Sequence, residues 1–242
     1  MGTSALRSVA AIVAATFVLA GCGGGSGGSS SGFTQRSIKN GFVKPADLGK
    51  GTIAFEDTGV AGHIIYTPED SVPTCPYVQR ADDAPVDAMT PAVELQGGNS
   101  TGRFIVGPQN PKRDSPPVVT QGAVVFHNAQ LADEGMKKVN AVASKCPSSW
   151  TILGGPPQII GKYTVTSRPL ELHGWTGFSQ QLAHVSPRDV NPDTYDDLVT
   201  VVLHKDNAIL YAGFAQIKNT GERADSGVKA EQVMKQALAR LN

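Results

Sequence analysis

The stretch that most constrains the fold runs over residues 123–146, where the spacing of apolar residues changes from that of a strand to that of a helix. Residues 123–126 form a short apolar run that predicts a strand, and Asn128 is a residue type that favours helix N-caps. The apolar residues that follow recur at spacings of four, three, four and three: Ala132, Met136, Val139, Ala143 and Cys146. This unit predicts a strand that leads into a helix whose buried stripe includes a cysteine.

Residues 1–21 have the parts of an export signal. One cation, Arg7, precedes an apolar run over residues 9–20, which is too short to cross the ~30 Å hydrocarbon core of a bilayer. The end of the run resembles the lipobox of bacterial lipoproteins: Leu19, Ala20, Gly21 and Cys22. The resemblance implies a signal peptide cleaved before Cys22, lipidation of that residue with diacylglycerol and acyl chains such as palmitate, and a stable anchor at the outer face of the cell membrane. The alternative is a secreted protein with a chance cysteine near its cleavage site.

Residues 23–32 contain only glycine and serine and predict a flexible tether. A coil of this length has a root-mean-square reach of roughly 17 Å. The run also matches the glycine patterns of hydrolase nucleophile elbows and dinucleotide sites, but both motifs require a strand before them and a helix after them. We interpret these matches as products of composition. The predicted organisation is therefore a signal peptide (1–21), a lipidated cysteine with its linker (22–32) and one domain (33–242).

The composition of the chain is that of a globular protein with balanced charge. Apolar residues make up 40% and charged residues 17%, and no repeat or second core interrupts residues 33–242. Lys+Arg and Asp+Glu both total 21. This balance gives no electrostatic case for a nucleic-acid partner or for a polybasic membrane face.

With Cys22 assigned to lipid, two cysteines remain, Cys75 and Cys146. An exported protein meets an oxidising compartment, so we predict a disulfide bond between them. The bond would attach an irregular, proline-rich loop over residues 70–91 to the buried side of the helix. The alternative is a pair of free buried thiols.

The remaining pattern predicts a mainly antiparallel α+β domain, with two long helices packed on one side of the sheet. A helical turn is expected after Pro45, and a second long helix begins near Ser226. Asp206 and Asn207 favour a tight hairpin turn. The stripe of the second helix consists of Ala230, Met234, Ala237 and Leu241. Further strands are predicted over residues 52–55, 62–67, 101–106, 163–167, 178–185, 198–204 and 208–217.

No group of residues in the sequence has the spacing of a catalytic or metal site. The five histidines lack the short spacings of metal ligands. An EF-hand-like start at Asp189 fails at Thr194 and Thr200, where the loop needs glycine and glutamate. Ser226 and Lys229 match a serine–lysine pair, but Ser226 is better explained as a helix cap. We therefore expect no metal, no cofactor and no enzymatic activity.

The best candidates for ligand contacts are His173 and Trp175, which stand between flexible glycines. Loops of this composition often bind ligands, and Tyr163 in the preceding strand is a third candidate for the rim of a pocket. The favoured interpretation of the loop is a plain turn that needs glycine, with an exposed aromatic residue beside it.

The order of these elements resembles the extracellular sensor domain of PknH-type receptor Ser/Thr kinases, and free-standing lipoproteins of actinobacteria carry similar domains. The resemblance rests on the strand at residues 123–126, the helix that ends in Cys146 and Trp150, and an opening segment over residues 45–49. It implies an α+β sheet with a cleft, disulfide bonds and no catalytic residue. The chain has one possible bridge where the kinase domain has two, and no kinase segment.

Three hypotheses about function follow, of which the least favoured is an exported hydrolase, because the sequence offers no nucleophile–base arrangement. The first is a membrane-anchored binding or sensor-like module for a small molecule or a component of the cell envelope. The alternative is an envelope-assembly or accessory protein that binds another protein and has no ligand pocket. An enclosed cleft favours the first hypothesis, and a flat, exposed apolar patch favours the second.

Overall fold

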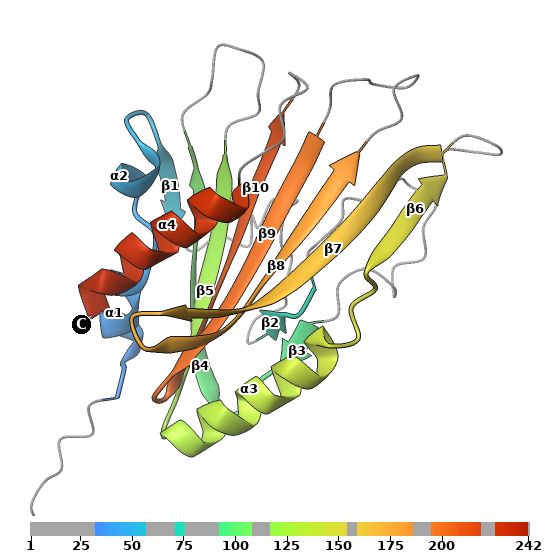
Figure 1. Ribbon diagram of the computed structural model, residues 1–242. Coiled ribbons are helices and arrows are strands. Elements are labelled where there is room, and N and C mark those ends of the chain that lie inside the picture. The colour runs from blue at the N-terminus through green and yellow to red at the C-terminus, as the bar shows by residue number, and fades with distance from the viewer. Residues whose placement is uncertain are drawn as a thin grey trace, which may run out of the picture. The chain divides into compact units, whose positions relative to one another are not determined.

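The centre of the fold is an eight-stranded sheet in which all neighbouring strands are antiparallel (Figure 1). The computed structural model describes residues 32–56, 71–75, 92–107, 117–153, 159–185, 195–218 and 226–241. It divides the chain into Met1–Ser31 and Gly32–Asn242, and the described residues all belong to the second unit. Cys22 and the predicted strand over residues 62–67 lie outside the described residues.

The strands of the sheet follow the order β1-β4-β5-β10-β9-β8-β7-β6, which confirms the predicted antiparallel sheet. They are β1 (Ile53–Glu56), β4 (Gly98–Val106), β5 (Val118–Phe126), β6 (Ser149–Leu153), β7 (Ile159–Leu172), β8 (Trp175–Val185), β9 (Tyr195–Lys205) and β10 (Ala208–Lys218). Two short strands, β2 (Ser71–Pro73) and β3 (Ala92–Glu94), form a separate antiparallel pair. The helices are α1 (Gln35–Ile38), η1 (Lys39–Gly41), α2 (Pro45–Leu48), α3 (Ala129–Ala143), α4 (Ser226–Leu238) and η3 (Ala239–Leu241).

The two long helices cover opposite faces of the sheet, so the predicted one-sided covering is wrong. On β5, Val124 and Phe126 pack in a cluster with residues of α3, whereas Ala123 and Val125 pack in a cluster with residues of α4. Successive side chains of a strand point to opposite faces, which places the helices on different sides. The physical reason is that β9 and β10 carry nearly unbroken apolar runs, as strands buried on both faces do.

Helix α3 confirms the predicted strand-to-helix unit but ends earlier than its stripe suggested. The Asn128 side chain accepts a hydrogen bond from the backbone N–H of Leu131 at 3.0 Å, as an N-cap does. The residues of α3 that are buried are Ala132, Gly135, Met136 and Val139. The helix ends at Ala143, and Cys146 follows it in a turn. The cysteine therefore lies beyond the helix rather than on its buried face.

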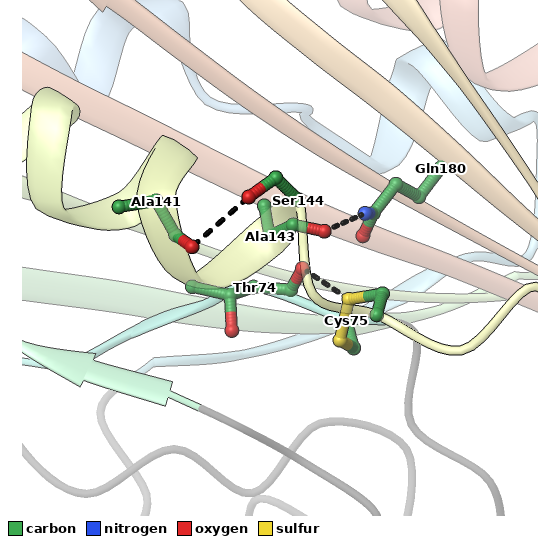
Figure 2. The surroundings of a disulfide bond; sticks show 7 residues. Thr74, Cys75, Ala141, Ala143, Ser144 and Gln180 are labelled. Carbon is green, nitrogen blue, oxygen red and sulfur yellow. Dashed lines mark hydrogen bonds between the residues drawn. A yellow bond between two sulfur atoms is a disulfide. The ribbon is translucent and has the colours of Figure 1, made fainter.

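A disulfide bond joins Cys75 to Cys146, whose Cα atoms are 5.9 Å apart (Figure 2). Cys75 comes directly after Thr74 and the short strand β2, so part of the predicted irregular loop is a strand. The Nε2 atom of Gln180 on β8 donates to the carbonyl oxygen of Ala143 at 3.5 Å. The bond thus connects the small sheet to the end of α3, where that helix meets the large sheet.

Two-residue turns close the two long hairpins of the sheet. Asp206 and Asn207 join β9 to β10, and Asp206 has a φ of 50°, which confirms the predicted turn. His173 and Gly174 join β7 to β8 with φ values of 52° and 76°. The favoured interpretation of the second loop as a turn is therefore confirmed.

Buried amide side chains attach the N-terminal segment to the sheet as backbone pairing would. Gln121 on β5, which is 2% exposed, accepts from the N–H of Val43 at 2.7 Å and donates to its carbonyl oxygen at 2.8 Å. Asn207 in the β9–β10 turn accepts from the N–H of Phe33 at 2.6 Å and donates to its carbonyl oxygen at 3.0 Å. Each amide satisfies one donor and one acceptor, so the segment is held without a strand of its own.

Candidate functional site

A groove opens between α4, α2 and the ends of two central strands, and we call it the α4 groove. Its volume is about 330 Å³. Apolar residues from three elements form much of its lining: Leu48 of α2, Val118 and Val119 at the start of β5, and Phe214 and Ala215 near the end of β10. Val119 and Phe214 belong to the core cluster beneath α4. The apolar part of the groove is therefore an extension of the hydrophobic core.

Helix α4 supplies the other wall through a stripe next to the one that holds it on the sheet. The stripe that lines the groove is Lys229, Gln232, Val233 and Gln236. These positions follow the i, i+3, i+4, i+7 spacing of a single helix face. The neighbouring stripe is buried in the core: Ala230, Met234, Ala237 and Leu238. Packing of the second stripe therefore fixes the direction in which the first one points.

The α2 side of the groove is held by an ion pair with the end of the chain. The guanidinium of Arg240 donates to both carboxylate oxygens of Asp47, at 3.1 and 2.9 Å. It also donates to the carbonyl oxygens of Asn40, at 3.0 Å, and Phe42, at 2.7 Å. The backbone N–H of Lys44 adds a further bond to Asp47 at 2.7 Å. The carboxylate is occupied by structural partners and sets the distance between α2 and the end of α4.

The lining of the α4 groove is suited to binding an amphipathic ligand. Its strand-derived part is apolar, while Gln232 and Gln236 carry carboxamides that donate and accept hydrogen bonds, and Lys229 carries an ammonium group. Serine, cysteine and histidine are absent from the described residues that line it. What the described lining offers is hydrogen bonds, apolar contact and the amine of Lys229.

The described part of the chain holds no group of three His, Cys, Asp or Glu residues that could bind a metal ion. His204 of β9 instead lies 3.2 Å from the carboxylate of Asp133 on α3, where its role is to connect strand and helix. Among the described helices, none is long and apolar enough to span a membrane.

Trp175 is fully buried, so the expectation of an exposed aromatic residue beside the turn is wrong. Its exposed fraction is 0%, and its ring lies 5.1 Å from that of Phe33 at the start of the domain. His173 is exposed in the turn, and its carbonyl oxygen accepts from Lys205 at 3.4 Å. The aromatic ring therefore serves the core, because it covers the point where the N-terminal segment joins the sheet.

Tyr163 lies far from the other two predicted contact residues. It pairs with His184 in β8, whereas Leu172 of the same strand pairs with Trp175. The nine positions from Tyr163 to Leu172 span roughly 30 Å of extended chain. The structure does not bring Tyr163 together with His173 and Trp175, and neither of these last two lines the α4 groove.

The apolar stripe that predicts the second helix does not include the residues that line the α4 groove, and Lys229 stood out only as the partner of Ser226. A sequence pattern that could have indicated the groove lies on the neighbouring face of the same helix, where Lys229, Gln232, Val233 and Gln236 repeat at helical spacing. The strand residues opposite them could not be assigned, since their meeting depends on the order of strands in the sheet.

No family model and no curated protein matches the chain. Among solved structures, the chain is similar to the extracellular domain of PknH from Mycobacterium tuberculosis. The identity is 9%, the match covers 87% of this chain and 97% of that one, and the TM-score is 0.48. This is the domain that the sequence resemblance named.

A second similar structure is that of LpqN, which is involved in cell envelope biogenesis of Mycobacterium tuberculosis. The identity is 11%, the match covers 79% of this chain and 88% of that one, and the TM-score is 0.25. Both TM-scores lie below 0.5.

Proposed function

We propose that this protein is a lipid-anchored binding module of the cell envelope, and that the α4 groove is its ligand-binding element. The observation that carries the proposal is the stripe of α4 that faces the apolar floor of the groove. Lys229, Gln232 and Gln236 are exposed, yet they point along a hollow whose floor is built from core residues. A ligand with an apolar body and a polar or anionic end matches this arrangement.

The size of the groove supports a small ligand or one end of a longer molecule. A volume of about 330 Å³ lies at the lower end of the range for small-molecule sites. Its described lining contains no serine, cysteine or histidine, so the nucleophile–base pair of a typical hydrolase is not found among these residues.

The alternative, an accessory protein that binds a partner protein through a flat patch, has less support. That hypothesis needs contiguous exposed apolar surface. In the part of the chain that the structure describes, the large hydrophobic side chain that stands exposed is Ile53, at 58%, on the edge strand β1. One such residue does not form a patch.

The anchoring part of the proposal depends on the lipobox at residues 19–22 and the glycine–serine run that follows it. Two or more acyl chains hold a protein on a membrane stably, whereas one chain does not. A domain on a tether that reaches roughly 17 Å would meet its ligand close to the membrane surface.

Native mass spectrometry of the protein purified from its own envelope extract tests the ligand site. We expect a retained small molecule in the wild type and its loss in Gln232→Trp, because a bulky side chain at this position fills the groove from its rim. Lys235→Trp is the matched control, since Lys235 is also exposed on α4 but does not line the groove. A wild type without a bound molecule but with a co-purifying protein would overturn the proposed ligand site. If both variants retain the small molecule equally, the binding site lies outside the α4 groove.

A further inference from the structure

A second hollow lies beside the first residues of the domain, and its lining includes basic side chains. It has a volume of about 650 Å³ and is open to solvent. Two cationic side chains line it, Arg36 of α1 and Lys39 of η1, together with the imidazole of His127 after β5. Uncharged polar residues such as Thr34 and Asn99 complete the lining, and no acidic residue is among its described members. We call this site the basic hollow.

The cations of the basic hollow belong to a segment whose charge differs from that of the whole chain. Residues 32–52 contain four cations and one acid, whereas the full sequence has 21 of each sign. That single acid is Asp47, which is paired with Arg240. Arg36 and Lys39 are exposed, and the salt bridges recorded within the described residues involve neither of them. The net charge of the whole chain is therefore balanced, although residues 32–52 form a basic region at the start of the domain.

The hydrogen bonds of Phe33 and Gln35 attach the first residues of the domain to the sheet beside the basic hollow. Phe33 follows the last linker residue and is held on both its N–H and its carbonyl oxygen by Asn207. Two residues further on, the Gln35 side chain donates to the carbonyl oxygen of Ser100 on β4 at 3.0 Å. The first residue that lines the hollow is Thr34, which follows the predicted linker by two positions in the sequence.

We propose that the basic hollow binds the headgroup phosphate of anionic phospholipid in the membrane that carries the anchor. The choice of membrane rests on the proposed lipidation of Cys22. A cation near an anionic membrane surface improves binding about fivefold, so two of them give only weak association by themselves. The tether makes weak association sufficient, because it keeps the hollow at an effective concentration near the millimolar range.

Vesicle flotation with the mature chain from residue 22, carrying Cys22→Ser, tests the hollow without the anchor. The vesicles contain phosphatidylcholine either alone or with phosphatidylglycerol, at low salt. We expect binding that depends on phosphatidylglycerol and weakens as salt shortens the screening length. The double variant Arg36→Gln/Lys39→Gln should lower the partition coefficient roughly thirtyfold. Lys137→Gln/Lys138→Gln is the control, since it removes the same charge from exposed positions of α3.

Three outcomes would overturn the proposal. The first is equal binding to vesicles with and without phosphatidylglycerol. The second is an equal loss of vesicle binding in both double variants. The third is that glycerol phosphate in solution binds the hollow as tightly as the vesicles do. The last outcome would assign the site to a soluble anion. The mass of the wild-type protein reports separately whether Cys22 is acylated, so a failure of the anchor is distinguishable from a failure of the hollow.

Discussion

Replacement of Gln121 by methionine tests how the N-terminal segment is held. Gln121→Met keeps the length and approximate volume of the side chain but removes both hydrogen bonds to Val43. Val43 is 0% exposed, so its N–H and carbonyl groups would lose their partners out of reach of water. An unsatisfied buried polar group costs about 1–3 kcal/mol, and two of them give about 4 kcal/mol. For a domain of this size the melting temperature should fall by roughly 8–16 °C.

Urea unfolding followed by far-UV circular dichroism measures the loss, and hydrogen exchange at the Val43 amide locates it. Gln130→Met is the matched control, because the Gln130 side chain also makes a hydrogen bond, to Glu134 at 3.0 Å, but on the exposed face of α3. An exposed pair of this kind contributes only about 0.2–0.5 kcal/mol. If both variants lose the same stability, or if exchange at Val43 does not accelerate, the Gln121 side chain does not hold the N-terminal segment on the sheet through its hydrogen bonds to Val43.

Two further changes test the packing of the fold. Cys75→Ser/Cys146→Ser should lose about 4 kcal/mol in urea unfolding, because the bond closes a loop with a sequence separation of 71. An unchanged midpoint, or two reactive thiols in the unreduced wild type, would contradict the bridge. Gly177→Ala should lose about 2–3 kcal/mol, since the new Cβ would collide with the Val202 carbonyl oxygen and lie 3.0 Å from the Cα of Leu203. Gly102→Ala is its control, with a nearest heavy atom at 3.3 Å, and equal losses would show that the backbone yields at both sites.

The elements that were predicted well are those set by neighbours in sequence. The stripe from Ala132 to Val139 and the Asn128 cap define α3, and Asp206 defines the turn between β9 and β10. Local spacing also contained an unused signal. The apolar runs in β9 and β10 indicate burial on both faces, and that signal would have placed the two long helices on opposite sides.

The features that were predicted badly depend on residues far apart in the chain. Trp175 is buried where its ring contacts that of Phe33, and no local sequence pattern predicts this contact. Gln121 and Val43 are separated by 78 positions, and Asn207 and Phe33 by 174. The α4 groove likewise joins the last long helix to α2 near the start of the domain. Such pairs become visible only when the strand order is known.

The two hydrogen bonds between Asn207 and Phe33 determine how a mechanical load from the membrane would enter the domain. A pull along the linker reaches Phe33 first and passes through Asn207 into the β9–β10 turn, at the centre of the sheet. The α4 groove lies at the other end of β5, since Val118 lines it while Phe126 lines the basic hollow. These two residues are roughly 26 Å apart along the strand. A load that passes through this attachment would therefore enter the sheet at the end of β5 opposite to the α4 groove.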